Sequence, residues 1–199
     1  MDVRKGPLKG AAENVAAAGL SEAITLRLGD GLHPLEAGEA DTILISGMGG
    51  PLMERILTEG MDKARAAEKL VLSPQSELPH FRKFLLENGF AVTDEALVEE
   101  EGKFYLILKA EPAVSGSHEA EDVWTEAELT YGKHLIRENS PEIKAFITRD
   151  IRIFEEILTE LDGMRGRKAA DRRETVERQL ELARTVLTGL REGEDHEGT

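Results

Sequence analysis

Residues 41–51 of the chain are Asp-Thr-Ile-Leu-Ile-Ser-Gly-Met-Gly-Gly-Pro. The apolar run at 43–45 is typical of a strand in the buried middle of a sheet. A Gly-rich turn, Ser46 to Gly50, follows directly, and Pro51 suits the first turn of a helix. The stretch therefore predicts a strand, a turn and a helix, an arrangement that places small ligands at the carboxyl ends of strands in an α/β sheet.

The region from Gly6 to about Ala110 alternates between short β-branched runs and helical periods. This alternation is typical of an α/β protein with a parallel sheet. An acidic, Gly-containing segment between the last two strands predicts an antiparallel hairpin. The predicted elements are helices over 7–18, 51–58 and 78–86 and strands over 24–28, 41–45, 69–72, 90–98 and 104–109.

A second, helical region follows a stretch of linker composition at 111–121. Apolar residues recur every three or four positions over 143–161 and again over 176–190, with a break at 163–168. Two such stripes predict an antiparallel, coiled-coil hairpin of helices. The predicted domains are an α/β domain over 1–112, a helical domain over 122–191 and a disordered tail over 192–199.

Composition excludes several classes of function. The chain has 199 residues and no cysteine, so thiolate metal sites and cysteine catalysis are excluded. No signal peptide or membrane-spanning run is found, which predicts a cytoplasmic protein. The histidines are scattered without metal-ligand spacing, so no metal site is predicted. They are His33, His80, His118, His134 and His196.

The net charge of −14 opposes non-specific attraction to nucleic acid unless positive charge is concentrated locally. One such concentration lies at the predicted tip of the helical hairpin, and we call it the tip cluster. Contact with RNA and an ordinary solvated turn are equally compatible with it. The tip cluster consists of Arg165, Arg167, Lys168, Arg172 and Arg173.

Polar and glycine residues follow the predicted strands at their carboxyl ends. Asp2 is suited to accept hydrogen bonds from ribose hydroxyls, and Asp30 from an adenine amino group. Gly47 and Gly49 lack side chains where a ligand must approach the backbone. Each turn alone is also typical of an ordinary strand end, but together they predict a nucleoside-shaped pocket.

Four motifs stand in the order and spacing of the bacterial tRNA adenine-N1 methyltransferase family that modifies adenine 22, and the chain resembles this family over nearly its whole length. The motifs are Asp-Val-Arg-Lys-Gly-Pro-Leu at 2–8, Gly-Asp-Gly-Leu at 29–32, Ile-Ser-Gly-Met-Gly-Gly at 45–50 and Gly-Lys-Phe-Tyr at 102–105. Tyr131-Gly132 and the helices after it resemble the family's coiled-coil C-terminal domain. The resemblance implies a Rossmann-like, class I enzyme that uses S-adenosylmethionine to methylate tRNA.

The resemblance also implies roles for particular residues. The implied cofactor contacts are Asp2, Val3, Asp30, Gly31, Ser46, Gly47 and Met48. The implied wall against the target base consists of Ser46, Gly47, Met48, Gly49 and Gly50. Adenine N1 is itself a nucleophile, so positioning and desolvation supply much of the rate, and no general base is assigned.

One departure from the family pattern concerns the N-terminal side. The family begins with a strand and a Gly-rich loop of the Asp-Ile-Gly-Ser-Asp-His type, for which this sequence shows no counterpart. We therefore expect a partial sheet whose strands 1 and 2 are largely missing between the strands ending at Leu28 and Ile45. The hypothesis is an N-terminally truncated product, or a start at an internal Met, without full activity.

Two other functions are weighed against the methyltransferase. A nicotinamide-dependent Rossmann enzyme also carries Gly and Asp at strand ends, although no Gly-x-Gly-x-x-Gly loop opens a helix here. A non-catalytic RNA-binding or assembly module would use the helical hairpin alone. The oligomeric state is left open by the sequence.

Overall fold

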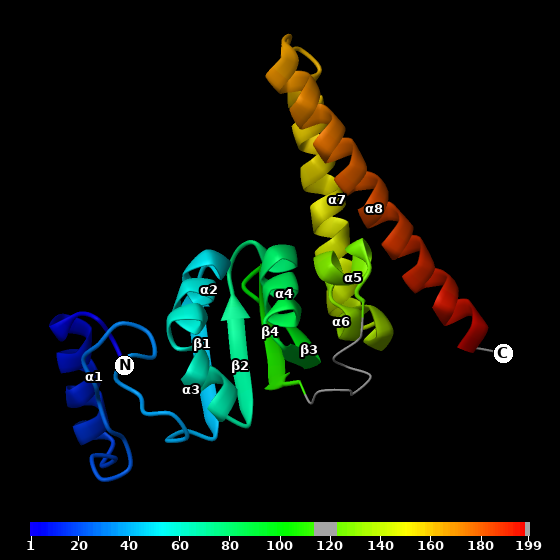
Figure 1. Cartoon of the computed structure of the whole chain (residues 1–199). Coiled ribbons are helices and arrows are strands. Elements are labelled where there is room, and N and C mark those ends of the chain that lie inside the picture. Colours follow the sequence, from blue (N-terminus) through cyan, green and yellow to red (C-terminus); the bar gives the residue numbers. More distant parts are fainter. Residues whose placement is uncertain (114–122, 198–199) are drawn as a thin grey trace. The chain divides into compact units, whose positions relative to one another are not determined.

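The computed structural model describes residues 1–113 and 123–197 as two compact units (Figure 1). The first contains Met1–Val92 and the strand segment that resumes at Leu108. The second contains Thr93–Ile107 and the C-terminal helices. The boundary differs from the predicted one at residue 112, because the end of the β-hairpin packs with the helices. Residues 114–121 of the predicted linker lie outside the described residues.

A mixed four-stranded sheet has the order β1-β2-β4-β3. β1 (Thr42–Met48) and β2 (Lys69–Pro74) are parallel, with Ile45 paired to Leu72. β4 (Lys103–Pro112) runs antiparallel to β2 and pairs Leu108 with Leu72. β3 (Phe90–Glu100) completes the predicted hairpin, which the structure confirms.

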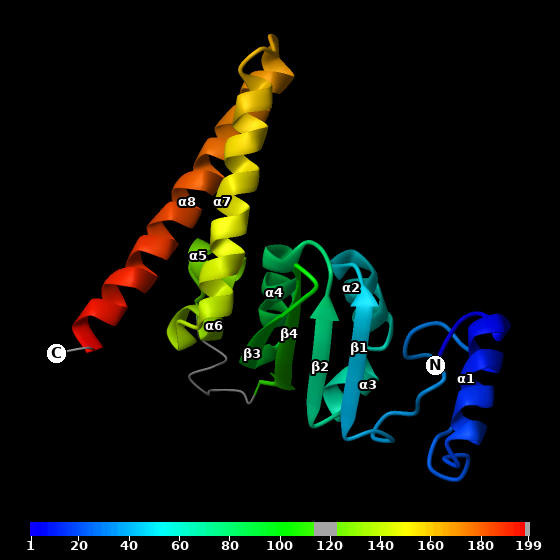
Figure 2. The ribbon, with the colours of Figure 1, turned by 180° about the vertical axis from the view of Figure 1, so that it is seen from behind.

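Four helices belong to the first unit: α1 (Lys5–Ala17), α2 (Gly50–Glu59), α3 (Met61–Ala66) and α4 (Leu78–Glu87). Figures 1 and 2 show α2 and α4 side by side. Met53 and Leu57 on α2 and Phe81 and Leu85 on α4 are fully buried. Burial of their apolar surface, together with Leu72 on β2, forms the core that holds the Gly-rich end of α2 in place.

The strand predicted over 24–28 is wrong, because only Leu28 takes part in pairing. It forms an isolated parallel bridge with Asp2, flanked by Asp2 N–H donating to Arg27 O at 3.3 Å and Gly29 N–H donating to Asp2 O at 3.0 Å. A ladder needs a run of partners, and after Asp2 the chain turns into α1 at Lys5. The segment 24–28 therefore lacks a neighbouring strand long enough to form a ladder with it.

The second unit contains α5 (Glu126–Tyr131), α6 (Lys133–Glu138), α7 (Pro141–Leu161) and α8 (Arg167–Glu197). α7 and α8 form the predicted antiparallel pair (Figure 1), with Ile143 and Ile147 facing a stripe that includes Val176 and Ala183. α8 continues through residues 192–197, where the sequence predicts a disordered tail. Once a helix is formed, each further residue adds one backbone hydrogen bond, so a polar segment extends it readily.

Charged pairs run along the outside of the helical hairpin. Arg184 donates to Glu155 across the two helices at 2.7 Å, and Arg152 lies 3.8 Å from Glu156 on the same helix. In the part of the chain that the structure describes, no helix is long and apolar enough to cross a membrane.

Candidate functional site

A cavity of about 620 Å³ lies in the first unit, between the N-terminal segment, the loop after Leu28 and β1. Its volume is in the range of about 300–1,000 Å³ that is usual for small-molecule sites. Six of the seven predicted cofactor residues line it: Asp2, Val3, Asp30, Gly31, Ser46 and Met48. Gly47 is not among the lining residues, and neither are Gly49 and Gly50.

The Gly-rich turn is tied to the next loop of the sheet. Gly47 has a φ of 73°, in the left-handed region that favours glycine. Gln75 N–H donates to Met48 O at 2.9 Å, and Gly50 N–H donates to Ser76 O at 3.2 Å. The two loops are therefore held together at the carboxyl edge of β1 and β2.

Gly49 and Gly50 stand close to Ser76 of the next loop. A Cβ at Gly49 would lie 2.9 Å from Ser76 Oγ, and a Cβ at Gly50 would lie 2.7 Å from Ser76 O. These two glycines therefore make room for the neighbouring loop. Of the three glycines in this turn, Gly47 alone has open space where its Cβ would stand.

The loop that contains Asp30 packs directly against α2. A Cβ at Gly31 would lie 2.9 Å from Ile56 Cγ2, and a Cβ at Gly60 would lie 2.6 Å from Leu32 Cβ. Leu32 is buried in this contact. α2 therefore begins at the last residue of the Gly-rich turn, and one side of the same helix packs against the Asp30 loop.

The far end of the same loop is closed by an ion pair. Arg27 donates to both carboxylate oxygens of Glu39 and to Pro34 O, the latter at 2.9 Å. The hydrogen bond from Arg27 lowers the pKa of Glu39 to about 2. About a third of each side chain is exposed to solvent, so the pair defines the loop's geometry more than it stabilises the fold.

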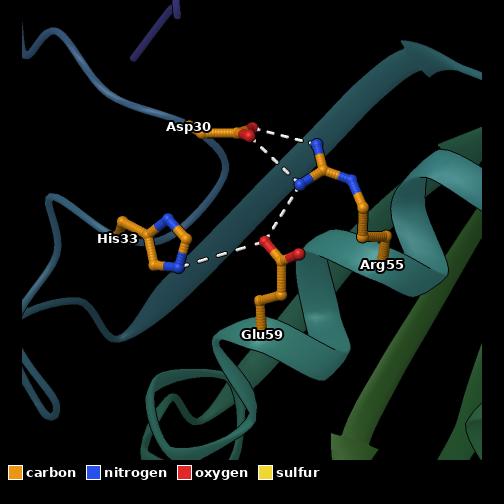
Figure 3. A network of polar contacts seen from close by, with 4 residues as sticks. All are labelled: Asp30, His33, Arg55 and Glu59. Carbon is orange, nitrogen blue, oxygen red and sulfur yellow. Dashed lines mark hydrogen bonds and ion pairs between the residues drawn. The ribbon is translucent and has the colours of Figure 1, made fainter.

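Asp30 is held by a bidentate ion pair (Figure 3). Arg55 Nη1 lies 3.0 Å from Asp30 Oδ2, and Nη2 lies 3.1 Å from Oδ1. Arg55 Nη1 also donates to Glu59 Oε2 at 2.9 Å, and His33 Nε2 lies 3.9 Å from the same oxygen. The hydrogen bonds from Arg55 hold the pKa of Asp30 below its usual range.

Asp2 also lines the cavity, and its carboxylate is fixed by a local hydrogen bond. Its Oδ1 accepts the backbone N–H of Arg4 at 2.7 Å, just before α1 begins. The bridge to Leu28 fixes the backbone of Asp2 beside the start of the Asp30 loop. Two acceptor-only side chains, Asp2 and Asp30, therefore line one cavity. Their contacts with a cofactor stay predictions.

The tip cluster lies in the second unit, at the connection between α7 and α8 and in the first turns of α8. Arg165, Arg167, Lys168 and Arg172 are exposed and form no ion pair with the residues that the structure describes. Arg173 differs, because it donates to Asp162 at 2.6 Å and lies 3.7 Å from Glu177. Four of the five predicted positive charges are thus available to a partner.

The family model described as TrmK, tRNA (adenine(22)-N(1))-methyltransferase, matches residues 1–185 of this chain. The chain belongs to this family. A Bacillus subtilis (strain 168) protein described as tRNA (adenine(22)-N(1))-methyltransferase is 33% identical over 184 residues, which are 92% of this chain and 74% of the relative. The family confirms the resemblance noted in the sequence and excludes the nicotinamide-dependent alternative.

Solved structures agree with the family assignment. The crystal structure of the B. subtilis m1A22 tRNA methyltransferase TrmK has a TM-score of 0.80 and 30% identity, covering 93% of this chain and 79% of that one. The Streptococcus pneumoniae protein Sp1610, solved in complex with S-adenosyl-L-methionine, has a TM-score of 0.80 and 31% identity and covers 94% and 78%. The fold is therefore that of an α/β methyltransferase with C-terminal helices, and the activity of its family is methylation of N1 of adenine 22 in tRNA.

Arg55 and Glu59 are the site residues that sequence reasoning missed. Their spacing of four on one helix is the usual signal of a surface ion pair, and it gives no hint of the third partner. Asp30 is 25 positions away from Arg55 in the sequence. Only the packing of the Asp30 loop on α2 brings them together.

Proposed function

We propose that the cavity of the first unit binds S-adenosylmethionine, with Asp2 accepting hydrogen bonds from the ribose and Asp30 from the adenine amino group. The observation that carries this proposal is that both carboxylates line one cavity of about 620 Å³ together with Gly31, Ser46 and Met48. The S. pneumoniae relative binds the same cofactor, which supports the assignment.

The lining of the cavity suits a nucleoside with an apolar extension. Carboxylates accept hydrogen bonds and do not donate them, which matches ribose hydroxyls and an exocyclic amine. Apolar side chains, among them Leu32, Ile45 and Met48, supply the rest of the surface. A few polar groups in an apolar pocket are the usual composition of a small-molecule site.

The wall for the target adenine is proposed at Ser46 to Gly50. S-adenosylmethionine supplies an activated methyl group on a sulfonium, and adenine N1 is the nucleophile. The chain's contribution is to hold the base in line with the methyl group and to exclude water. A base inside a folded tRNA must first leave its stack, so an open turn such as Gly47 offers it space.

Replacement of Asp30 by asparagine is expected to weaken binding of S-adenosylmethionine about tenfold, because one charge-assisted hydrogen bond becomes a neutral one. Isothermal titration calorimetry on the full chain measures the dissociation constant, and methylation of transcribed tRNA measures the accompanying loss of activity. Asp41→Asn is the matched control, since Asp41 is exposed and does not line the cavity. Equal dissociation constants for Asp30→Asn and the control would contradict the proposed adenine contact.

We further propose that the tip cluster contacts tRNA phosphates. The chain as a whole is strongly acidic, so a local group of unpaired positive charges is the feature that permits attraction to RNA. Arg165, Arg167, Lys168 and Arg172 meet this requirement, whereas the charge of Arg173 is largely compensated by Asp162 and Glu177.

Substitution of the four unpaired residues of the tip cluster by alanine is expected to weaken tRNA binding and to flatten its salt dependence. The slope of log K against log salt is negative, and each lost phosphate contact reduces its magnitude by about 0.7–0.9. Filter binding across a salt series measures the slope. The matched control removes four arginines from the sides of the helical hairpin: Arg152, Arg178, Arg184 and Arg191. A slope that changes equally in both variants would argue for a general charge effect instead of a contact at the tip.

A further inference from the structure

Arg55 lines the same cavity as Asp30 but comes from a different element, the middle of α2. Its guanidinium reaches across to the loop after Leu28 and meets the Asp30 carboxylate with two parallel hydrogen bonds of 3.0 and 3.1 Å (Figure 3). A bidentate pair fixes the plane of a carboxylate, which a single hydrogen bond does not.

Arg55 is itself held in place by its own helix. Glu59, one turn further along α2, accepts from Arg55 Nη1 at 2.9 Å. The backbone beneath this network is also close-packed, because Gly31 stands against Ile56 and Gly60 against Leu32. The position of Asp30 is therefore set by α2, the helix whose first residue is Gly50 of the Gly-rich turn.

We propose that Arg55 is a positioning residue for the cofactor, which acts by holding the Asp30 carboxylate in the orientation that accepts the adenine amino group. This inference rests on the proposed function of Asp30. Each carboxylate oxygen has two lone pairs, and Arg55 uses one on each oxygen. The remaining pair on each oxygen is free for a ligand in the cavity.

A pH dependence follows from the charges around Asp30. Arg55 and Glu59 face it from α2, His33 from its own loop, and Asp2 and Arg4 line the same cavity. The pKa of Asp30 is held low chiefly by the hydrogen bonds from Arg55, so its carboxylate stays ionised as the pH falls. Without Arg55 the pKa of Asp30 rises, so the carboxyl begins to take up a proton at a higher pH. A protonated carboxyl is a poorer acceptor for the adenine amino group.

The test compares the full chain with Arg55→Met, Arg55→Lys, Asp30→Asn and the double variant Asp30→Asn/Arg55→Met. Calorimetry with S-adenosylmethionine gives the dissociation constants at pH 7 and at steps down to about pH 4. Arg65→Met is the matched control, because Arg65 lies in the same unit and donates to Asn88 O at 3.0 Å, away from the cavity lining. Thermal unfolding of each free protein separates a binding defect from a folding defect.

Arg55→Met is expected to raise the dissociation constant about tenfold at pH 7, because the Asp30 carboxylate loses its fixed orientation. The factor is expected to grow about twofold further near pH 4, where an aspartate with an ordinary pKa is about half protonated. Arg55→Lys is expected to recover part of the affinity, since a lysine keeps the charge but not the bidentate geometry. The double variant is expected to bind no more than about twofold worse than Asp30→Asn alone, because Arg55 acts through Asp30.

The outcomes separate the two proposals. Weak binding by Asp30→Asn with normal binding by Arg55→Met would overturn the role of Arg55 and leave the adenine contact intact. Additive losses in the double variant, or a ratio of dissociation constants that does not change with pH, would also overturn it. Normal binding by Asp30→Asn would contradict the adenine contact itself, and the inference about Arg55 with it.

Discussion

Replacement of Gly50 by alanine is expected to destabilise the first unit by about 3 kcal/mol and to reduce tRNA methylation at least about a hundredfold. The added Cβ would lie 2.7 Å from Ser76 O, a backbone atom that is fixed by its own hydrogen bond from Gly50 N–H. Alanine has a helix propensity about 1 kcal/mol better than glycine. This gain is smaller than the combined free-energy cost of the clash with Ser76 O and the loss of the hydrogen bond to it. The start of α2 must therefore shift, and the Gly-rich turn shifts with it.

Urea unfolding measures the stability of the Gly50→Ala variant, and methylation of transcribed tRNA measures its activity. Gly10→Ala is the matched control, because Gly10 lies within α1 and a Cβ there meets nothing within 4 Å. The control is expected to gain about 0.5–1 kcal/mol, an effect of opposite sign. Wild-type stability for Gly50→Ala would contradict the close packing of Gly50 against Ser76 O.

Replacement of Glu95 by alanine is expected to cost the second unit about 3 kcal/mol. Glu95 is 3% exposed, and its Oε2 accepts the backbone N–H of His134 in the first turn of α6 at 3.0 Å. Gly132, with a φ of 93°, packs against the same carboxylate, where a Cβ would lie 2.6 Å from Oε2. Alanine leaves a cavity and a helix N-terminus without its anionic partner.

Glu95→Gln keeps the shape and one acceptor oxygen, so it is expected to lose about half as much stability as Glu95→Ala. Thermal unfolding followed by the helical circular dichroism signal measures both variants. Glu99→Ala on the exposed end of β3 is the matched control and is expected to stay within about 0.5 kcal/mol of wild type. A loss for Glu95→Ala no larger than that of the control would mean that the carboxylate does not support α6.

The sequence was sufficient where the signal for an element lies within the element. The apolar run before Ser46 and the two stripes of the helical hairpin are such signals, and the strand and the two helices were confirmed. The expected place of that strand in the buried middle of the sheet was wrong, because β1 lies at the edge of the described sheet and Leu44 is 66% exposed. The segment 24–28 alternates equally well, but a strand also requires a neighbour of matching length, which Asp2 alone does not provide. α3 was missed because six residues are too few to show a helical period.

The site residues were predicted from the ends of predicted strands. Asp2, Asp30 and Ser46 were named on this ground, and all three line the cavity. Only Ser46 belongs to a strand of the structure, since the segment before Asp30 forms no more than the bridge between Leu28 and Asp2. The role of Gly49 was not predictable, since a glycine that admits a ligand and a glycine that admits Ser76 have the same sequence signal. Arg55 was missed because its partner is distant in the sequence, and sequence patterns report only near neighbours.

The division of the β-hairpin between the two units has a consequence for synthesis on the ribosome. The chain leaves the first unit after Val92 and returns at Leu108, so part of each strand waits for helices that have not yet been made. Phe104 packs edge to face on Phe146, and residues 104 and 146 are 42 positions apart. At about 5–20 residues per second, that aromatic side chain spends several seconds without its partner. The nascent hairpin is thus open to a chaperone during that time.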